Sequence, residues 1–229
     1  MKDVSTHPAA KATTTATAKD ARRDDKAAAV LTAPLQVGSL PSFAFGTQSI
    51  LWWATLGLVL IEGTVFALAL ATYFYLRSHS QAWPPSSPPP ALLWGTVNTA
   101  ILLVSMLPNH WAKRASEQQD LRKSRLWLCV CLVFSLAFLA VRAFEFGALN
   151  VRWDADAYGS IVWTLLGLHT VHLVTDTYDS IVLAVLLFIG PLESKRFVDV
   201  NENADYWYFV VLSWLPIYAV IYWAPRFHG

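Results

Sequence analysis

Cysteine and charge are both scarce in this sequence of 229 residues, and each shortage excludes a class of protein. The two cysteines, Cys129 and Cys131, stand two positions apart, so on a helix they point to different sides and cannot form a disulfide framework. Charged residues make up only 14% of the chain against 55% hydrophobic residues, which argues against a water-soluble protein. The formal net charge of +1 gives no indication of nucleic-acid binding.

The N-terminal segment differs from the rest of the chain. Residues 1–30 contain no aromatic residue and are rich in Ala, Thr and charge, so they cannot bury enough surface to offset the entropy of ordering. They also lack the apolar core of a signal peptide. We therefore expect a disordered tail over 1–30 and an irregular lead-in at the membrane surface over 31–49, where prolines and glycines recur.

Five apolar segments follow, each long enough to cross a bilayer as a helix. They cover residues 50–76, 91–110, 126–149, 160–190 and 204–224. Runs this long and this uniformly apolar are not barrel strands. The sequence predicts an all-α protein whose domain over 50–229 is a bundle of five transmembrane helices, with a kink at Pro216 and a non-helical connection at 82–90, AWPPSSPPP.

Lysine and arginine are distributed unequally between the two sides of this topology. The connections at 111–125 and 191–203 carry seven of them, and the opposite side carries three. By the positive-inside rule, the N-terminus is cytoplasmic and the C-terminus periplasmic. Most tryptophans fall near predicted span ends, as in the aromatic belts of membrane proteins.

The stretch HTVHLVTD (169–176) places ionisable groups inside the fourth span. His169, His172 and Asp176 share one helix face, which is consistent either with a metal site or with a polar seam between helices. The other four histidines lie in the tail, in a loop or near span ends, so none completes a bis-histidine haem site, and the chain is short of ligands for a di-iron site. We favour the polar seam, with a single ion on His172 and Asp176 as the alternative.

Glu62, Arg142 and Glu145 are further ionisable residues that fall within predicted spans. A charge at the centre of a membrane helix costs about 2.5–3.5 kcal/mol, so these side chains should face the bundle interior, a partner subunit or a lipid headgroup. Arg142 and Glu145 stand three apart and can pair along one helix. Glu62 is followed by Gly63 and Thr64, which permit close helix packing.

Taken in order, several stretches of the chain resemble the cytochrome c oxidase subunit III family of the haem-copper oxidases. Glu62 resembles the family's buried carboxylate and Glu145 its later glutamate. The stretches that resemble family motifs are WPP (83–85), NTAILLVS (98–105), beginning at Asn98, YGSIVWTLLGLHTVH (158–172) and YWYFVVLSWLPIYAVIYW (206–223). The likeness covers about residues 50–225.

The sequence also departs from the family pattern. Larger members have seven spans, and this chain lacks the first two, which in those members form a lipid-holding cleft with the rest. Tyr208 and Val211 stand where the family has His and Asp, Arg142 replaces a Gln, and Asp176 replaces a Gly. We expect Arg142 and Asp176 to form a compensating charge pair.

The resemblance implies an accessory subunit of a bacterial respiratory oxidase in the inner membrane. The complete oxidase would oxidise cytochrome c, reduce O₂ to water and translocate protons. The chain would carry no redox centre, because haem a and copper belong to the partner subunits I and II. It would bind phospholipid, and its buried polar core or lipid contacts would be formed by Glu62, Asn98, Arg142, Glu145, His169, His172 and Asp176.

Alternative functions stay open at this stage. Subunit III of a quinol oxidase and the accessory subunit of nitric oxide reductase share the expected fold. A small transporter could use Glu62 and Asp176 as a proton relay, although no inverted repeat is evident among the five spans.

Overall fold

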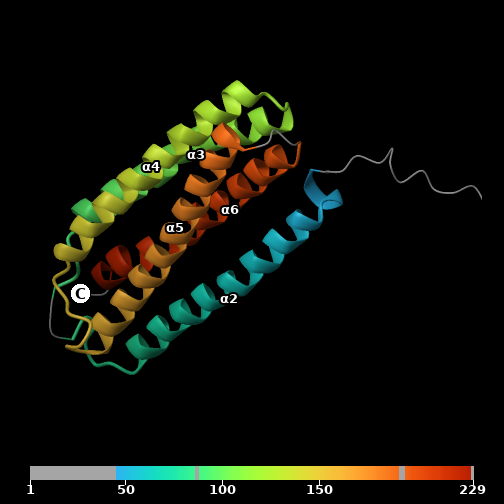
Figure 1. The fold of residues 1–229 in the computed structure, drawn as a ribbon. Helices are drawn as coiled ribbons and strands as arrows, with labels where there is room; N and C mark the ends of the chain where they lie inside the picture. Colours follow the sequence, from blue (N-terminus) through green and yellow to red (C-terminus); the bar gives the residue numbers. More distant parts are fainter. Residues whose placement is uncertain (1–44, 86–87, 191–193, 228–229) are drawn as a thin grey trace, which may run out of the picture. The chain divides into compact units, whose positions relative to one another are not determined.

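The computed structural model describes residues 45–85, 88–190 and 194–227, and long helices make up nearly all of them (Figure 1). All five are long and apolar enough to cross a membrane, and no strand occurs in the described ranges. The predicted all-α bundle of five transmembrane helices is therefore confirmed. The helices are α2 (Ile50–Ser78), α3 (Leu92–Glu117), α4 (Leu121–Gly147), α5 (Ala157–Ile189) and α6 (Lys195–Tyr218).

The predicted tail (1–30) and most of the predicted lead-in (31–44) lie outside the described residues. The described end of the lead-in contains a short 3₁₀ turn, η2 (Gly46–Gln48). Ser49 then caps α2, since its side chain accepts a hydrogen bond from the backbone N–H of Leu51 at 3.1 Å.

Helices α3, α4 and α6 extend beyond the apolar runs that predicted them. The connections expected at 111–125 and 191–203 are therefore largely helical where they are described, and only a short turn separates α3 from α4. The length of an apolar run matches the thickness of the hydrocarbon layer of the membrane. A helix can continue past that run, because it ends only where its terminal backbone groups find capping partners.

Two aspartates begin the helices α4 and α5. Asp120 accepts from the backbone N–H of Lys123 at 3.1 Å to begin α4, and Asp156 accepts from that of Gly159 at 2.7 Å to begin α5. The Lys123 backbone N–H, aided by the Lys123 side chain, lowers the pKa of Asp120 below its usual value. This cap is therefore present above the ordinary pKa of an aspartate and is lost only as pH falls through the lowered value.

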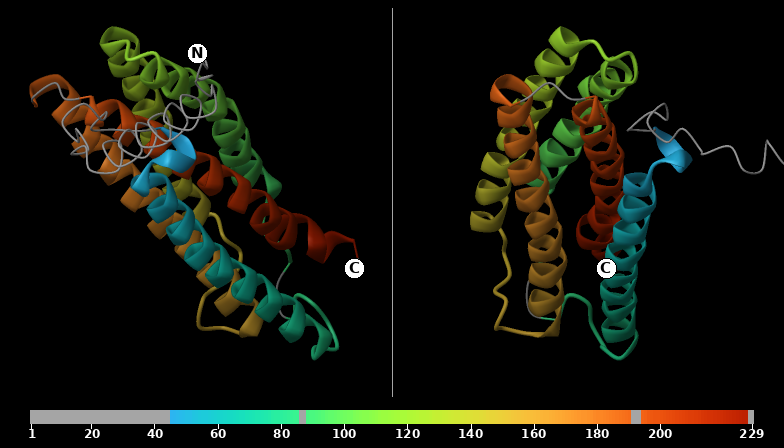
Figure 2. Two further views of the ribbon diagram at one scale, coloured as in Figure 1. Left: turned by 90° about the vertical axis from the view of Figure 1, so that its right-hand side faces the viewer. Right: turned by 45° about the vertical axis from the view of Figure 1, so that its right-hand side comes forward.

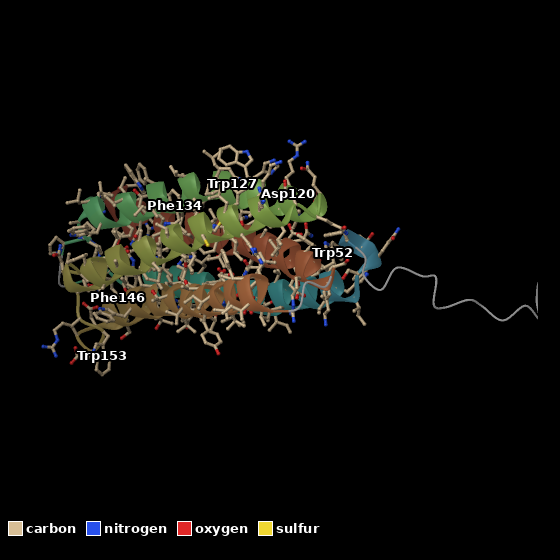
Figure 3. All side chains as sticks on the ribbon, turned by 45° about the horizontal axis from the view of Figure 1, so that its top comes forward. Trp52, Asp120, Trp127, Phe134, Phe146 and Trp153 are labelled. Atoms are coloured by element: carbon tan, nitrogen blue, oxygen red, sulfur yellow. The ribbon has the colours of Figure 1, made fainter. Side chains whose placement is uncertain are left out.

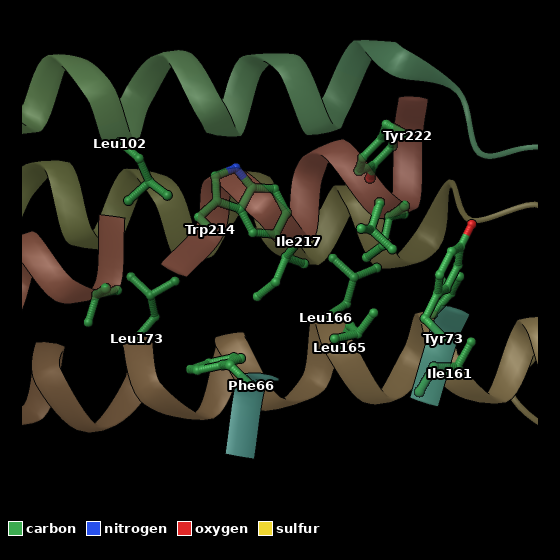
Figure 4. Close-up of a cluster of buried hydrophobic side chains, with 14 of the residues drawn as sticks. Phe66, Tyr73, Leu102, Ile161, Leu165, Leu166, Leu173, Trp214, Ile217 and Tyr222 are labelled. Atoms are coloured by element: carbon green, nitrogen blue, oxygen red, sulfur yellow. The ribbon is translucent and has the colours of Figure 1, made fainter. Parts of the chain in front are cut away.

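Packing divides the bundle unequally. Helix α3 packs against α4 and α6, α5 packs against α4 and α6, and α2 packs mainly against α5 and α6. Figure 2 shows α2 at the edge of the bundle. Only Phe66 and Tyr73 of α2 are buried, and they lie seven positions apart on the face toward α5 (Figure 4). Many other apolar side chains of α2 are exposed, whereas Ala69, Leu70 and Leu76 are partly buried against the core.

The buried core is continuous along α5 and α6. Leu165, Leu166 and Leu173 of α5 meet Trp214 and Ile217 of α6 in the cluster drawn in Figure 4. All five are fully buried. This apolar core places the polar side chains of the same two helices at fixed positions.

Two helices contain a proline, and tryptophans lie near the ends of the bundle. A π-helical turn, η3 (Ala219–Trp223), and a 3₁₀ turn, η4 (Ala224–Arg226), follow three residues after Pro216, which is where the sequence predicted an irregularity. Helix α3 contains a second proline, Pro108, whose position the sequence reasoning did not use. Figure 3 shows Trp52 near one end of the helices and Trp153 near the other.

The close contact between α3 and α6 leads to a prediction. A Cβ at Gly95 would lie 2.5 Å from the ring of Tyr222, and that ring is held by a hydrogen bond from its hydroxyl to Glu145. We expect Gly95→Ala to lower the stability of the assembled protein by about 1–3 kcal/mol, because an added methyl group overpacks a filled site. Thermal unfolding of the purified assembly measures this.

Gly57→Ala provides the matched control, because a Cβ there would have nothing within 4 Å. Equal melting temperatures for the two variants would contradict the assigned contact.

Candidate functional site

The first polar cluster joins α3, α4 and the π-helical turn η3 within the bundle. Arg142 Nη1 donates to Glu145 Oε2 at 2.8 Å, and both side chains are about 1% exposed. The Glu145 carboxylate also accepts from the amide of Asn98 on α3 and from the hydroxyl of Tyr222. One carboxylate therefore connects three segments of the chain, and we call these residues, together with His169, the Glu145 cluster.

Aromatic rings surround the Arg142 guanidinium in the Glu145 cluster. Its carbon lies 4.2 Å from the ring centroid of Trp214 and 4.7 Å from that of Phe138. Cation–π contact of this kind stabilises a desolvated guanidinium, and Arg suits it better than Lys because its planar group stacks on rings. Charge pairing and ring contact together explain how an arginine is accommodated at this depth.

His169 extends the Glu145 cluster to α5, and its two nitrogens have distinct roles. Nε2 lies 3.0 Å from the carbonyl oxygen of Val210 and must donate to it, because a carbonyl only accepts. Nδ1 lies 3.3 Å from Arg142 Nη2, which is always a donor, so Nδ1 accepts. The two contacts together require a neutral imidazole with its proton on Nε2.

The second polar cluster attaches α2 to the bundle. The Tyr206 hydroxyl donates to Glu62 Oε2 at 2.7 Å, and His172 Nδ1 lies 3.3 Å from the same oxygen. The ring of Phe66 lies 4.9 Å from that of His172 and covers this group. We call Glu62, His172 and Tyr206 the Glu62 cluster; it is the polar connection of α2 to both α5 and α6.

The expected pairing of Arg142 with Asp176 is wrong. Arg142 contacts Glu145 and His169, whereas both carboxyl oxygens of Asp176 lack a hydrogen-bond partner among the described residues. Asp176 lies seven positions beyond His169 on α5, which is about 10 Å along the helix axis. At that level α5 meets α4 through Thr177 and Ser135, well away from Arg142.

The HTVHLVTD stripe therefore divides among three environments. His169 belongs to the Glu145 cluster, His172 belongs to the Glu62 cluster, and Asp176 lines a cavity. Within the described ranges, no three His, Cys, Asp or Glu side chains converge as metal ligands would. The chemistry available to these groups is hydrogen bonding and charge pairing between helices.

Sequence reasoning missed Tyr206, Tyr222 and Trp214 as members of these clusters. All three lie in YWYFVVLSWLPIYAVIYW, where Trp214 stands eight positions from Tyr206 and eight from Tyr222. Eight positions turn an α-helix by about 80° and sixteen by about 160°, so helical periodicity does not bring the three to one face, and no signal in the sequence grouped them.

The cavity lies between α2, α5 and α6 and has a volume of about 560 Å³. Its polar lining includes several carboxyl groups besides Asp176, and Leu and Val side chains form much of the remaining wall. The sequence analysis identified Glu62 and Asp176 separately but did not bring them to one cavity, because they belong to helices separated by about a hundred residues.

This architecture defines an integral-membrane helical protein whose buried polar groups bind its helices to one another. A model of the family cytochrome c oxidase subunit III matches residues 48–225. The chain belongs to this family, and it is on that basis a non-catalytic subunit of an oxidase complex.

Similar curated proteins carry the same family name. The cytochrome c oxidase subunit 3 of Pylaiella littoralis is 26% identical over 72% of this chain and 64% of its own length. That of Thermostichus vulcanus is 24% identical over 72% of this chain and 83% of its own length. The probable cytochrome c oxidase subunit 3 of Nocardia farcinica is 25% identical over 69% of this chain and 79% of its own length. The chain thus spans slightly under two thirds of the length of the Pylaiella protein and about four fifths of the length of the other two.

The family resemblance inferred from the sequence is confirmed by these matches. The motifs that carried it, from the Glu62 region to the final YWYF stretch, fall within the matched residues. The roles of the individual site residues stay predictions.

The Arg142–Glu145 pair leads to a prediction that uses the Gln found at the Arg142 position in the family pattern. Glu145→Gln leaves Arg142 buried without a counter-ion, so we expect a loss of about 3 kcal/mol in the free energy of unfolding. Arg142→Gln in the same background should recover part of that loss, because it removes the unpaired charge. Unfolding of the four proteins in a double-mutant cycle measures the coupling.

Additive effects in that cycle would show that the two charges do not depend on each other. That result would remove the ion pair from the description of the Glu145 cluster.

Proposed function

We propose that this chain is the accessory subunit III of a bacterial respiratory haem-copper oxidase that oxidises cytochrome c and reduces O₂ to water. The match of the family over 48–225, which includes every described transmembrane helix, is the observation that carries the proposal. The complex would lie in the inner membrane with the N-terminus of this chain cytoplasmic, as the distribution of Lys and Arg favours.

The partners in this proposal are oxidase subunits I and II, which hold haem a and copper. The residues of this chain bind no redox centre; they hold a helical surface in a fixed shape against the catalytic subunits. Phospholipid fills the lateral surface of α2, whose apolar side chains are exposed over most of its length.

The two polar clusters have a positioning role within this function. The Glu145 cluster keeps α3, α4, α5 and α6 in register, and the Glu62 cluster holds α2 to α5 and α6. Buried polar contacts of this kind fix helix register in a membrane, where apolar side chains alone have little preference between lipid and protein. Subunit I would therefore meet a surface with a single arrangement.

Purification of the native assembly through an affinity tag on this chain tests the proposed function. We expect haem a in the optical spectrum of the preparation, together with subunits I and II and cytochrome c oxidation that consumes O₂. A tag on an unrelated multi-pass membrane protein from the same cells is the control.

Three outcomes distinguish the alternatives. A preparation that oxidises quinol and not cytochrome c would replace the proposed donor. Reduction of nitric oxide in place of O₂ would indicate the reductase-associated relative. Tagged protein that carries no haem-containing partner at all would contradict the role as an oxidase subunit.

A further inference from the structure

The cavity between α2, α5 and α6 contains more acidic groups than the polar clusters require. It is lined by five carboxyl side chains, and its volume is about 560 Å³. They belong to Glu62, Asp176, Asp179, Asp199 and Glu202. Such a concentration of one sign of charge inside a membrane bundle demands a counter-charge or a set of protons.

No described residue pairs with the carboxyl group of Asp176 on the wall of this cavity. The Asp176 side chain is buried, with the residue 3% exposed, and both of its carboxyl oxygens lack a hydrogen-bond partner in the described part of the chain. Buried polar atoms are almost always satisfied in native proteins, so an orphaned carboxyl on a cavity wall indicates a group that the cavity holds.

The basic side chains near the cavity are already engaged. Arg196 Nη1 lies 3.4 Å from Asp199, and Lys113 pairs with Asp205 on the side of α6 that faces α3. None of the described residues that line the cavity is Lys or Arg. The field inside the cavity is therefore negative, and it favours a cation over an anion.

The remaining wall limits the kind of cation. Leu51 and Leu58 of α2 face Val182, Leu183 and Leu186 of α5 across the cavity. The described residues do not bring together three metal-ligating side chains, which a bound metal ion requires. An apolar wall beside an isolated carboxyl instead fits a hydrocarbon chain that ends in an ammonium group, since an ammonium carries three hydrogen-bond donors and no acceptor.

We propose that this cavity binds the ammonium head of an amphiphile, with the Asp176 carboxylate as its anchor and Leu58 and Leu183 against the adjoining chain. The site discriminates by charge: it accepts a cationic head and rejects an anionic one of the same chain length. This selectivity is a property of the chain itself and does not depend on the oxidase assignment.

Spin-labelled alkylamine and spin-labelled fatty acid of equal chain length test the proposal. Each probe is added at neutral pH to the native tagged complex in phosphatidylcholine vesicles, and the motionally restricted fraction is read by electron paramagnetic resonance. We expect the complex to retain the amine about tenfold more tightly than the acid, since an ammonium group donates charge-assisted hydrogen bonds to a carboxylate and a second carboxylate is repelled by it.

Asp176→Asn keeps the shape of the side chain and removes its charge, so it should abolish the preference for the amine. Glu117→Gln is the matched control: Glu117 ends α3, is exposed and does not line the cavity, so its loss should leave the preference unchanged. The wild-type comparison of amine with acid requires no variant, and it stands even where Asp176→Asn fails to assemble.

Two results would overturn the site. Equal retention of amine and acid by the wild-type complex would mean that Asp176 holds a proton and not a ligand. Undiminished preference in an assembled Asp176→Asn complex would place the selectivity elsewhere. Haem a in the same preparation reports separately on the proposed function, so the two proposals fail independently.

The source of the ammonium group can be read from the same complex. Phosphatidylethanolamine enriched among co-purified lipids, relative to the surrounding membrane, identifies a lipid head. Displacement of the spin-labelled amine by added spermidine, without such enrichment, identifies a soluble amine and would contradict the amphiphile.

Discussion

The ion pair of Arg142 and Glu145 lies where neither water nor lipid headgroups solvate it, so the protein itself has to supply the partners of both charges. Moving such charges from water to a low-dielectric interior costs several kcal/mol per ion, and attraction within the pair offsets this only with good geometry and further hydrogen bonds. Asn98, Tyr222, His169 and the rings around the guanidinium provide these contacts. Four helices are thereby held to one arrangement.

The position of α2 also depends on a buried polar group that needs partners from the protein, in this case Glu62. Little of this helix is buried, and lipid satisfies its apolar surface nearly as well as protein would. The Glu62 cluster is what distinguishes one placement of α2 from another, because only one register brings Glu62 to Tyr206 and His172. The acidic cavity is the space enclosed on the other side of that contact, toward the beginning of α2. The proposed ligand site is therefore next to the Glu62 cluster that attaches α2, and Glu62 and Tyr206 belong to both.

Polar groups of this chain hold its helices to one another. Its polar residues are costly in lipid and are positioned by other polar residues, which separates them from the exposed apolar surfaces that meet lipid or another subunit. Asp176 departs from that pattern, since both of its carboxyl oxygens are buried without a hydrogen-bond partner in the described part of the chain, as are those of Glu202 on the same cavity. That departure is why we assign Asp176 to a ligand and not to the scaffold.

Sequence alone determined the number of spans, the all-helical class and the family, because membrane thickness imposes a length on apolar runs and the motifs occur in a fixed order. It also predicted the local pair of Arg142 with Glu145, since residues three apart on a helix are neighbours. Only the tertiary structure decided where His169, His172 and Asp176 go. The partners of the two histidines lie on α2, α4 and α6, and the rotation and register of packed helices depend on contacts between segments distant in the chain, which helical periodicity does not encode.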